Sequence, residues 1–223
     1  MKKTIITILA ITLFGCGQDT NITQTENGSK SDTTAVTNSL PVSQVDFFKA
    51  STPAYRETPE ATLTTKLDPY VLIINSDNSY VLNCDGKEIS KNSLIKDMRI
   101  VREFAVVRNN KLFIYFEATD AEVGTSYLTR IDLKSNKIDW ETHIWGFNIG
   151  EPLISKDNVY LTAFGTVGKV SLETGQPAWL YNDLYEKQKS NSFEKIVQSN
   201  DKIIFTDDNG KKIIVDDNSG KIQ

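Results

Sequence analysis

A strand–turn–strand unit recurs along most of this chain and constrains its fold more than any other feature. From residue 70 onward, short runs in which apolar and polar residues alternate are separated by turn dipeptides such as Asp-Gly, Asn-Asn, Thr-Gly and Asn-Gly. Alternation is typical of half-buried strands, and this punctuation is the strongest local signal of a β-hairpin. Helical spacing occurs only within residues 180–195, which we expect to form a short helix or a long polar loop. The sequence therefore predicts an all-β fold.

The hairpins belong to a longer repeat. The segments IDLKSNKIDW and VSLETGQPAW end at Trp140 and Trp179, which lie 39 residues apart, and Gly175 and Gly220 lie 45 residues apart. Units of about 40–50 residues built from short strands are typical of β-propeller blades, and about four of them fit this chain. We expect the Thr-Gly turn to close a hairpin within one blade, and the Trp to cap the contact with the neighbouring blade.

The stretch NVYLTAFGTVGKVSLETGQPAWLY resembles the repeat of the quinoprotein-type (PQQ-like) β-propellers, in which an acidic residue, Thr-Gly and a Trp follow two apolar strands. Among exported lipoproteins, the chain is similar to the propeller lipoprotein of the outer-membrane barrel-assembly machinery. The resemblance implies seven or eight blades, whereas about four fit here. We therefore expect a small closed ring, a partly closed stack of sheets, or a degenerate relative. The outer strand of the last repeat is predicted to be very short, absent, or replaced by an N-terminal strand such as EATLTTKL.

Residues 1–15 are typical of a bacterial lipoprotein signal peptide. Two lysines are followed by an apolar run over residues 5–14, which is too short to span a bilayer because a span needs about 20 apolar residues. Residues 13–16 resemble the lipobox, whose cysteine becomes the acylated first residue of the mature protein, so Cys16 is the predicted lipidation site. By the same resemblance, Gly17 in the next position implies an outer-membrane location, facing the periplasm. The alternative is an ordinary signal peptide cut nearby, with Cys16 incidental.

Residues 16–44 are predicted to form a lipidated flexible tether ahead of a folded domain over residues 45–223. The tether is rich in Thr, Ser, Asn and Gln and has no aromatic residue, so it cannot bury enough apolar surface to offset its ordering entropy. The whole chain has a net charge of −4 and a single histidine, which argues against a nucleic-acid partner. Apart from Cys16, Cys84 is the remaining cysteine, and we expect it to be a buried strand residue rather than a reactive thiol.

The sequence favours a protein without catalytic activity, cofactor or metal. Quinone-dependent dehydrogenases need a large cavity and a Ca²⁺ ion held by oxygen ligands, and the Asp clusters of residues 206–211 and 215–221 are the candidates for such ligands. Each cluster lies where a tight turn is predicted, and Asp and Asn are common turn formers. A calcium site is the alternative. His143 has no second His or Cys nearby in the sequence to complete a metal or nucleophile set.

Two segments carry candidate partner-binding residues. HIWGFNIGEP (residues 143–152) contains Trp145 and Phe147 on either side of a glycine between two repeats, and aromatic residues in such loops dominate interface hot spots. The predicted helix or loop of residues 180–195 adds Tyr181 and Tyr185. The alternative is that Trp145 and Phe147 fill the gap between adjacent blades.

Two functions of different classes follow from these features. The first is a membrane-anchored periplasmic lipoprotein that binds another protein as a scaffold, in outer-membrane protein assembly. The second is a periplasmic immunity or inhibitor lipoprotein that neutralises a toxin or hydrolase. The family resemblance favours the first, and the small number of repeats favours the second. A small-ligand or sugar-binding propeller is a third interpretation, although no convergent polar set in the sequence indicates a pocket.

Overall fold

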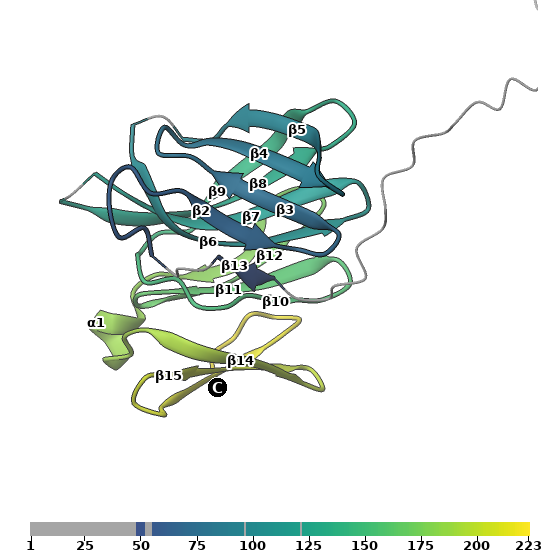
Figure 1. The fold of residues 1–223 in the computed structure, drawn as a ribbon. Coiled ribbons are helices and arrows are strands. Elements are labelled where there is room, and N and C mark those ends of the chain that lie inside the picture. Colours follow the sequence, from purple (N-terminus) through teal and green to yellow (C-terminus); the bar gives the residue numbers. More distant parts are fainter. Residues whose placement is uncertain (1–47, 52–54, 96, 121) are drawn as a thin grey trace, which may run out of the picture. The chain divides into compact units, whose positions relative to one another are not determined.

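The computed structural model describes residues 48–51, 55–95, 97–120 and 122–223. The predictions for residues 1–15 and 16–44, including lipidation of Cys16, lie outside the described residues. The described chain forms four antiparallel sheets in which strands consecutive in sequence are neighbours in space. Figure 1 shows the sheets following one another in chain order, with one short helix beside the last of them. The all-β, propeller-like prediction is confirmed.

Each of the first two sheets is a four-stranded meander, and the second has one added strand. The first sheet contains β2 (Leu63–Lys66), β3 (Tyr70–Ile74), β4 (Ser79–Cys84) and β5 (Lys87–Ser93). The second sheet contains β6 (Arg99–Arg108), β7 (Lys111–Thr119), β8 (Gly124–Asp132) and β9 (Lys137–His143), with β1 (Lys49–Ala50) paired to β6.

The third sheet is also a four-stranded meander, and the fourth is a meander of three strands. The third sheet contains β10 (Leu153–Ile154), β11 (Asn158–Ala163), β12 (Thr166–Ser171) and β13 (Pro177–Tyr181). The helix α1 (Leu184–Gln188) follows, within the segment for which a helix or loop is predicted. The fourth sheet contains β14 (Phe193–Ser199), β15 (Lys202–Asp207) and β16 (Lys212–Asp216).

Burial along the strands reflects the position of each sheet in the stack. In β7, every residue from Leu112 to Ala118 is buried, because the second sheet has a sheet on each side. In β3 and β15, buried residues alternate with more exposed ones, because these sheets have one neighbour. Cys84 is buried in β4, as predicted. Burial also raises the pKa of its thiol, so it is not poised to react.

Three apolar cores join the sheets pairwise in chain order. The first core lies between the first and second sheets, the second between the second and third, and the third between the third and fourth. Among the described residues, no apolar core joins the fourth sheet to the first. Of the three arrangements that the sequence allows, this is the partly closed stack.

The N-terminal strands do not complete the last repeat. The segment that contains EATLTTKL forms β2, which pairs with β3 as the first strand of the first sheet. The fourth sheet has three strands, and a single bridge between Val215 and Ile222 marks the place of a fourth. The outer strand of the last repeat is therefore very short, one of the three predicted outcomes.

The two tryptophans do cap the contacts between neighbouring sheets. The ring of Trp140 in β9 lies so close to Gly175 that a Cβ placed on this glycine would be 2.5 Å from the ring. The ring of Trp179 in β13 lies in the same way against Gly220, 2.8 Å from a Cβ placed there. Each tryptophan thus stacks on the turn of the following sheet, and only a glycine leaves room for it.

A β-bulge sets up each of these contacts. Register shifts occur between Arg130 and Ile131 in β8, beside Trp140, and between Lys169 and Val170 in β12, beside Trp179. Since a bulge re-aims the side chains next to it, it turns each tryptophan toward the next sheet. The repeat in the sequence is therefore a repeat of inter-sheet contacts as well as of hairpins.

Candidate functional site

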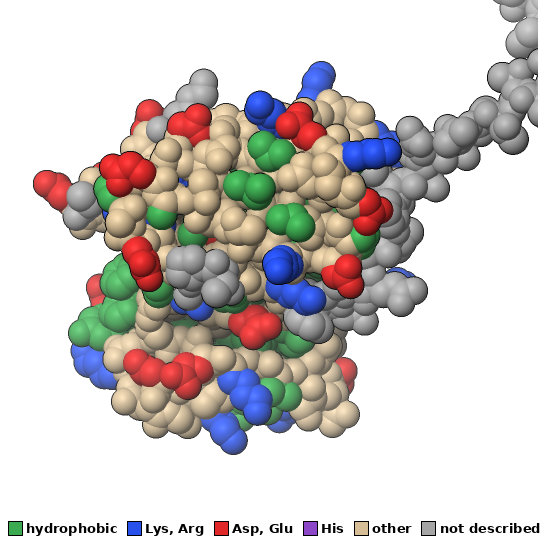
Figure 2. Space-filling model, in the orientation of Figure 1, with side chains coloured by type: hydrophobic (Ala, Val, Ile, Leu, Met, Phe, Trp, Pro, Cys, Tyr) green, Lys and Arg blue, Asp and Glu red, His purple; other side chains and the backbone are tan. Residues whose placement is uncertain are grey.

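Three exposed aromatic side chains lie at the edge of the sheets that carries the linker between β9 and β10. Trp145 and Phe147, from the linker between β9 and β10, are 52% and 45% exposed, and Tyr185 of α1 is 46% exposed. The rings of Phe147 and Phe164 stack at 5.0 Å with an interplanar angle of 6°, and Phe164 contacts Tyr185 at 4.9 Å. We call Trp145, Phe147, Phe164 and Tyr185 the aromatic patch. Figure 2 shows hydrophobic side chains gathered at the left, next to α1 of Figure 1.

Trp145 ends a ladder of rings that leads out of the core. Ring centroids of Phe116 and Tyr127 are 5.5 Å apart, those of Tyr127 and His143 4.9 Å, and those of His143 and Trp145 4.1 Å. Burial lowers the pKa of His143, so its imidazole is neutral at pH 7 and stacks as an aromatic ring. The Trp145 ring is thereby packed against His143 on one side.

Hydrogen bonds fix the linker that carries Trp145 and Phe147. A carboxylate oxygen of Glu117 in β7 accepts the backbone N–H of Asn148 at 2.9 Å. The N–H of Phe164 donates to the carbonyl of Phe147 at 2.6 Å, and the hydroxyl of Ser126 donates to the carbonyl of Trp145 at 3.1 Å. Burial raises the pKa of Glu117, while the backbone donors oppose that rise. These contacts tie the linker to the second and third sheets.

The backbone is strained at two positions of this region. Among the described residues, nine residues other than glycine have positive φ, and seven of them are Asn or Asp, which tolerate the left-handed conformation. The two exceptions are Trp145, with φ 69°, and Lys189, with φ 56°. Lys189 follows α1, and its Nζ lies 5.8 Å from the centroid of the Tyr185 ring. The left-handed conformation of Lys189 ends α1, as at many helix C-termini. The one at Trp145 has no such local cause, and strain of this kind concentrates at functional sites.

Comparison with solved structures shows which known folds this chain resembles. BamB from Moraxella catarrhalis is 13% identical, with 69% of this chain and 48% of that chain covered and a TM-score of 0.48. The europium-containing methanol dehydrogenase is 11% identical, with 71% and 40% covered and a TM-score of 0.53. The quinohemoprotein alcohol dehydrogenase from Comamonas testosteroni is 10% identical, with 72% and 34% covered and a TM-score of 0.52. The fold is that of propeller blades.

These similarities concern the fold and not the activity. The chain spans less than half the length of each of the three proteins. No protein-family model and no curated protein matches the chain. Function must therefore be argued from the residues of the site.

The fourth candidate residue, Tyr181, lies outside the aromatic patch. It belongs to β13, its ring contacts Trp179 at 6.2 Å, and its hydroxyl donates to the carbonyl of Gly220. The contact ties the third sheet to the fourth, so Tyr181 has a structural role there. Sequence spacing groups Tyr181 with Tyr185 on one helical face, but α1 begins only at Leu184.

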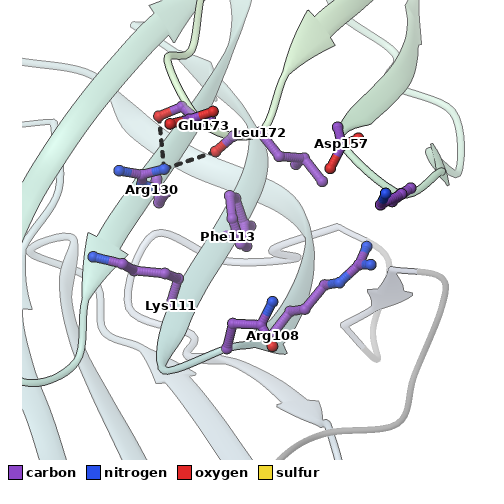
Figure 3. A pocket seen from close by; sticks show the side chains of 9 residues that line it. Arg108, Lys111, Phe113, Arg130, Asp157, Leu172 and Glu173 are labelled. Carbon is purple, nitrogen blue, oxygen red and sulfur yellow. Dashed lines mark hydrogen bonds between the residues drawn. The ribbon is translucent and has the colours of Figure 1, made fainter.

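A hollow at the opposite edge of the sheets contains Arg130 and Lys111, both of which are already paired. It has a volume of about 230 Å³ and lies between the second and third sheets, with Phe113 among its lining residues. Arg130 donates to Asp139 and to the carbonyls of Leu172 and Glu173, and Figure 3 shows the last two bonds. Lys111 forms ion pairs with Asp132 and Asp139. The bonds from Arg130 to the two carbonyls join the second sheet to the third, so we assign the hollow a structural role.

A second hollow lies beside the linker of the aromatic patch. It has a volume of about 540 Å³ and is lined by polar residues that include Arg102, Asn148 and Glu151. The Arg102 guanidinium lies 5.3 Å from the Tyr55 ring and 5.0 Å from the Phe104 ring, and the Tyr55 hydroxyl donates to Asn148. The sequence gives no sign of this convergent polar set, because its members come from three distant segments. It enlarges the surface next to the patch with groups that can hydrogen-bond.

The two Asp clusters form turns, as predicted. One carboxylate oxygen of Asp207 accepts the N–H groups of Asn209 and Lys211 at 3.0 and 2.8 Å, and Asp216 accepts the N–H of Ser219 at 2.7 Å. Among the described residues, no group of three or more His, Cys, Asp or Glu side chains could hold a metal ion. In the same part of the chain, no helix has the length and apolar character needed to cross a membrane.

Replacing Trp145 with asparagine should change the free energy of unfolding by less than about 1 kcal/mol. Asparagine relieves the left-handed strain, and this gain offsets the lost ring contact with His143. In the matched variant Trp179→Asn, an inter-sheet contact is lost and the cost should be about 3 kcal/mol. Chemical denaturation of both variants measures the difference. Equal losses in the two variants would mean that Trp145 fills a gap between blades rather than serving as a binding residue.

Proposed function

We propose that this protein is a non-catalytic, protein-binding scaffold, anchored to the outer membrane through a lipid on Cys16 and facing the periplasm. The aromatic patch is its contact surface for the partner, and outer-membrane protein assembly is the process it serves. The observation that carries the proposal is the linker, strained at Trp145, that holds Trp145 and Phe147 in exposed positions.

The chemistry of the patch supports protein binding. Trp and Tyr are enriched in interface hot spots, because they supply a large, rigid contact area with a polar group at one end. The rings come from a linker, a hairpin turn and a helix that hydrogen-bond to one another: the N–H of Leu184 donates to the carbonyl of Gly165 at 3.1 Å, next to Phe164. Three segments distant in sequence thus present one preformed surface, which is typical of a scaffold.

His143 and Cys84 lie apart in the fold. Within the described residues, His143 is stacked between the rings of Tyr127 and Trp145, and one of its ring nitrogens bonds the Thr125 hydroxyl. Cys84 is buried on a different sheet. A nucleophile and its base must lie within hydrogen-bond reach of each other, and these two side chains do not form such a pair.

Site-specific photocrosslinking in the native membrane tests the proposal. A photoreactive phenylalanine analogue is placed at Trp145 or at Tyr185, with Ile138, which is 39% exposed in β9, as the matched control position. We expect one protein to be crosslinked from both patch positions and not from position 138. Adducts of equal strength at all three positions, or none at the patch, would contradict the assigned surface.

The identity of the crosslinked protein tests the process. A component of the barrel-assembly machinery would support a scaffold in outer-membrane biogenesis, whereas a single soluble toxin or hydrolase would replace that proposal with an inhibitor. The same cells carrying Cys16→Ser test the anchor, because a chain without the lipid should leave the membrane fraction. A Cys16→Ser chain that is still processed and remains membrane-bound would refute the anchor alone.

A further inference from the structure

The second hollow, beside the linker of the aromatic patch, contains an arginine without its expected partner. Arg102 in β6 lies directly opposite Glu117 in β7 in the register of the second sheet, which is the usual geometry for an ion pair between strands. In the described part of the chain, these two side chains form no ion pair. One carboxylate oxygen of Glu117 instead accepts the N–H groups of Asn148 and Ile149 at 2.9 and 3.4 Å.

The Arg102 guanidinium is therefore held in place with most of its donors unpaired. Its one hydrogen bond to a described residue runs from Nη1 to the Tyr55 hydroxyl at 3.4 Å, and its Nε is buried without an acceptor. The rings of Tyr55 and Phe104 lie 5.3 and 5.0 Å from the guanidinium carbon. Since a guanidinium has five N–H donors, Arg102 keeps free donors at the wall of the hollow. Their planar fork matches the two oxygens of a carboxylate.

A chain of hydrogen bonds continues from Arg102 along one wall of the hollow. The Tyr55 hydroxyl donates to the side-chain oxygen of Asn148 at 2.9 Å, and the Asn148 amide donates to the Ser192 hydroxyl. The carbonyl of Ser192 accepts the N–H of Asp208 at 2.9 Å. These bonds connect the second sheet, the linker and the fourth sheet, so the wall is fixed by the fold rather than by one loop.

Three acidic residues, Glu151, Glu194 and Asp208, also line the hollow, and all three are exposed. Their segments are in close contact, because a Cβ placed on Gly150 would lie 2.5 Å from the carbonyl oxygen of Phe193. Glu194 is the extra residue of a β-bulge in β14, and a bulge re-aims the side chain that it carries. None of the three carboxylates forms an ion pair with a described residue.

The hollow thus offers charges of both signs to a ligand. Arg102 is the positive residue of its lining, against three carboxylates, and Glu117 lies next to Arg102. These carboxylates repel a simple anion, and a simple cation leaves the donors of Arg102 unpaired. A ligand with one carboxylate and a cationic side chain satisfies both. The volume of about 540 Å³ lies within the range of about 300–1,000 Å³ found for ligand pockets.

We propose that the second hollow is a binding site for a basic amino acid, either free or at the C-terminus of a peptide. The carboxylate of the ligand accepts hydrogen bonds from the free donors of Arg102. Its side-chain ammonium or guanidinium group lies among the carboxylates of Glu151, Glu194 and Asp208. The residues of the aromatic patch do not line this hollow, so the site adds a second binding function to the scaffold.

A titration with L-lysine and cadaverine tests the site, because cadaverine is lysine without its carboxylate. The full chain without its lipid is labelled with ¹⁵N, and each ligand is added up to about 10 mM. We expect L-lysine to shift the amide signals of Gly150 and Ser192 with a dissociation constant below about 1 mM. Cadaverine should bind about tenfold more weakly, since it leaves the Arg102 donors unpaired.

Three variants make the test specific. Arg102→Gln should weaken L-lysine about tenfold and leave cadaverine no weaker, so that the preference for lysine disappears. Glu194→Gln should weaken both ligands, because it removes an attraction that both use. Arg108→Gln is the matched control, since Arg108 also lies in β6 but lines the other hollow, and it should bind both ligands as the parent protein does. The ratio of the two affinities does not change when part of the protein is merely unfolded.

The ligand Nα-acetyl-L-lysine identifies the source of the amino acid, because its α-nitrogen is an amide, as in the last residue of a peptide. Binding as tight as that of L-lysine supports the C-terminus of a peptide. Binding of L-lysine alone supports a free amino acid. Both results keep the carboxylate on Arg102 and the side-chain cation among the acidic residues.

Three results would overturn the proposal. The first is the absence of shifts at Gly150 and Ser192 up to about 10 mM L-lysine. The second is cadaverine binding as tightly as L-lysine, which would mean that the carboxylates attract any cation. The third is an Arg102→Gln variant that keeps the preference for lysine. Crosslinking from Trp145 or Tyr185 bears on none of these results, because neither residue lines the hollow, so the two proposals fail independently.

Discussion

Replacing Gly175 with alanine should lower the free energy of unfolding by about 3 kcal/mol. Gly175 has φ 73°, and a Cβ on it would lie 2.5 Å from the ring of Trp140. The substitution therefore adds backbone strain and pushes the ring off the turn. Because Trp140 joins the second sheet to the third, the damage reaches the contact between sheets.

The variant Gly210→Ala separates the two causes of the expected loss, which are backbone strain and displacement of the Trp140 ring. Gly210 has φ 76°, close to that of Gly175, but its Cβ position is open, so this variant carries the backbone strain alone, about 1 kcal/mol. Urea denaturation of both variants, read by far-ultraviolet circular dichroism, gives the two values. Similar losses at the two positions would mean that the stacking of Trp140 on Gly175 contributes little to stability.

Replacing Glu103 with glutamine should stabilise the protein above pH 7 by up to about 3 kcal/mol. Glu103 is fully buried in β6, and burial raises the pKa of its carboxyl from 4.5 to about 7, although hydrogen bonds and Arg56 oppose the rise. The Thr65 hydroxyl donates to one of its oxygens at 2.5 Å. A neutral amide of the same shape fits this site without the cost of a buried charge.

The sign of the pH dependence follows from proton uptake. Between pH 4.5 and about 7, the folded state holds a proton on Glu103 that the unfolded state has lost, so stability falls as the pH rises through this window and levels off above it. The Glu103→Gln variant has no carboxyl group at this position, so it does not lose stability in this way as the pH rises. The difference in unfolding free energy between variant and parent should therefore be small at pH 4.5 and largest at pH 8. The pH dependence from His143 is common to both proteins and cancels in that difference.

Urea denaturation across this pH range measures the effect, and Glu88→Gln is the control. Glu88 is exposed in β5, so its substitution should leave stability nearly unchanged at every pH. A Glu103→Gln variant that is less stable than the parent at pH 8 would show that the carboxylate is needed for its bonds. The hydrogen bond from Thr65 and the attraction to Arg56 would then stabilise the carboxylate by more than its burial costs.

Much of the candidate site could be predicted from sequence, because local composition marks it. Trp145 and Phe147 stand out as large rings around a glycine in a linker, and Tyr185 lies in the one segment with helical spacing. The sequence does not indicate the left-handed backbone conformation at Trp145, since tryptophan rarely adopts that conformation. The sequence does not mark Phe164 either, because its role depends on stacking between Phe147 and Tyr185.

The sequence by itself determined the hairpins, their number and their approximate period, because turn chemistry and alternation act over a few residues. It also indicated that Trp140 and Trp179 lie between blades, since their spacing follows the repeat. The tertiary structure alone decided the rest. It placed residues 63–66 in the first sheet rather than the last, left no apolar core between the described parts of the fourth and first sheets, and buried Glu103 beside Thr65. These outcomes depend on contacts between segments far apart in the chain, whose energies no local pattern records.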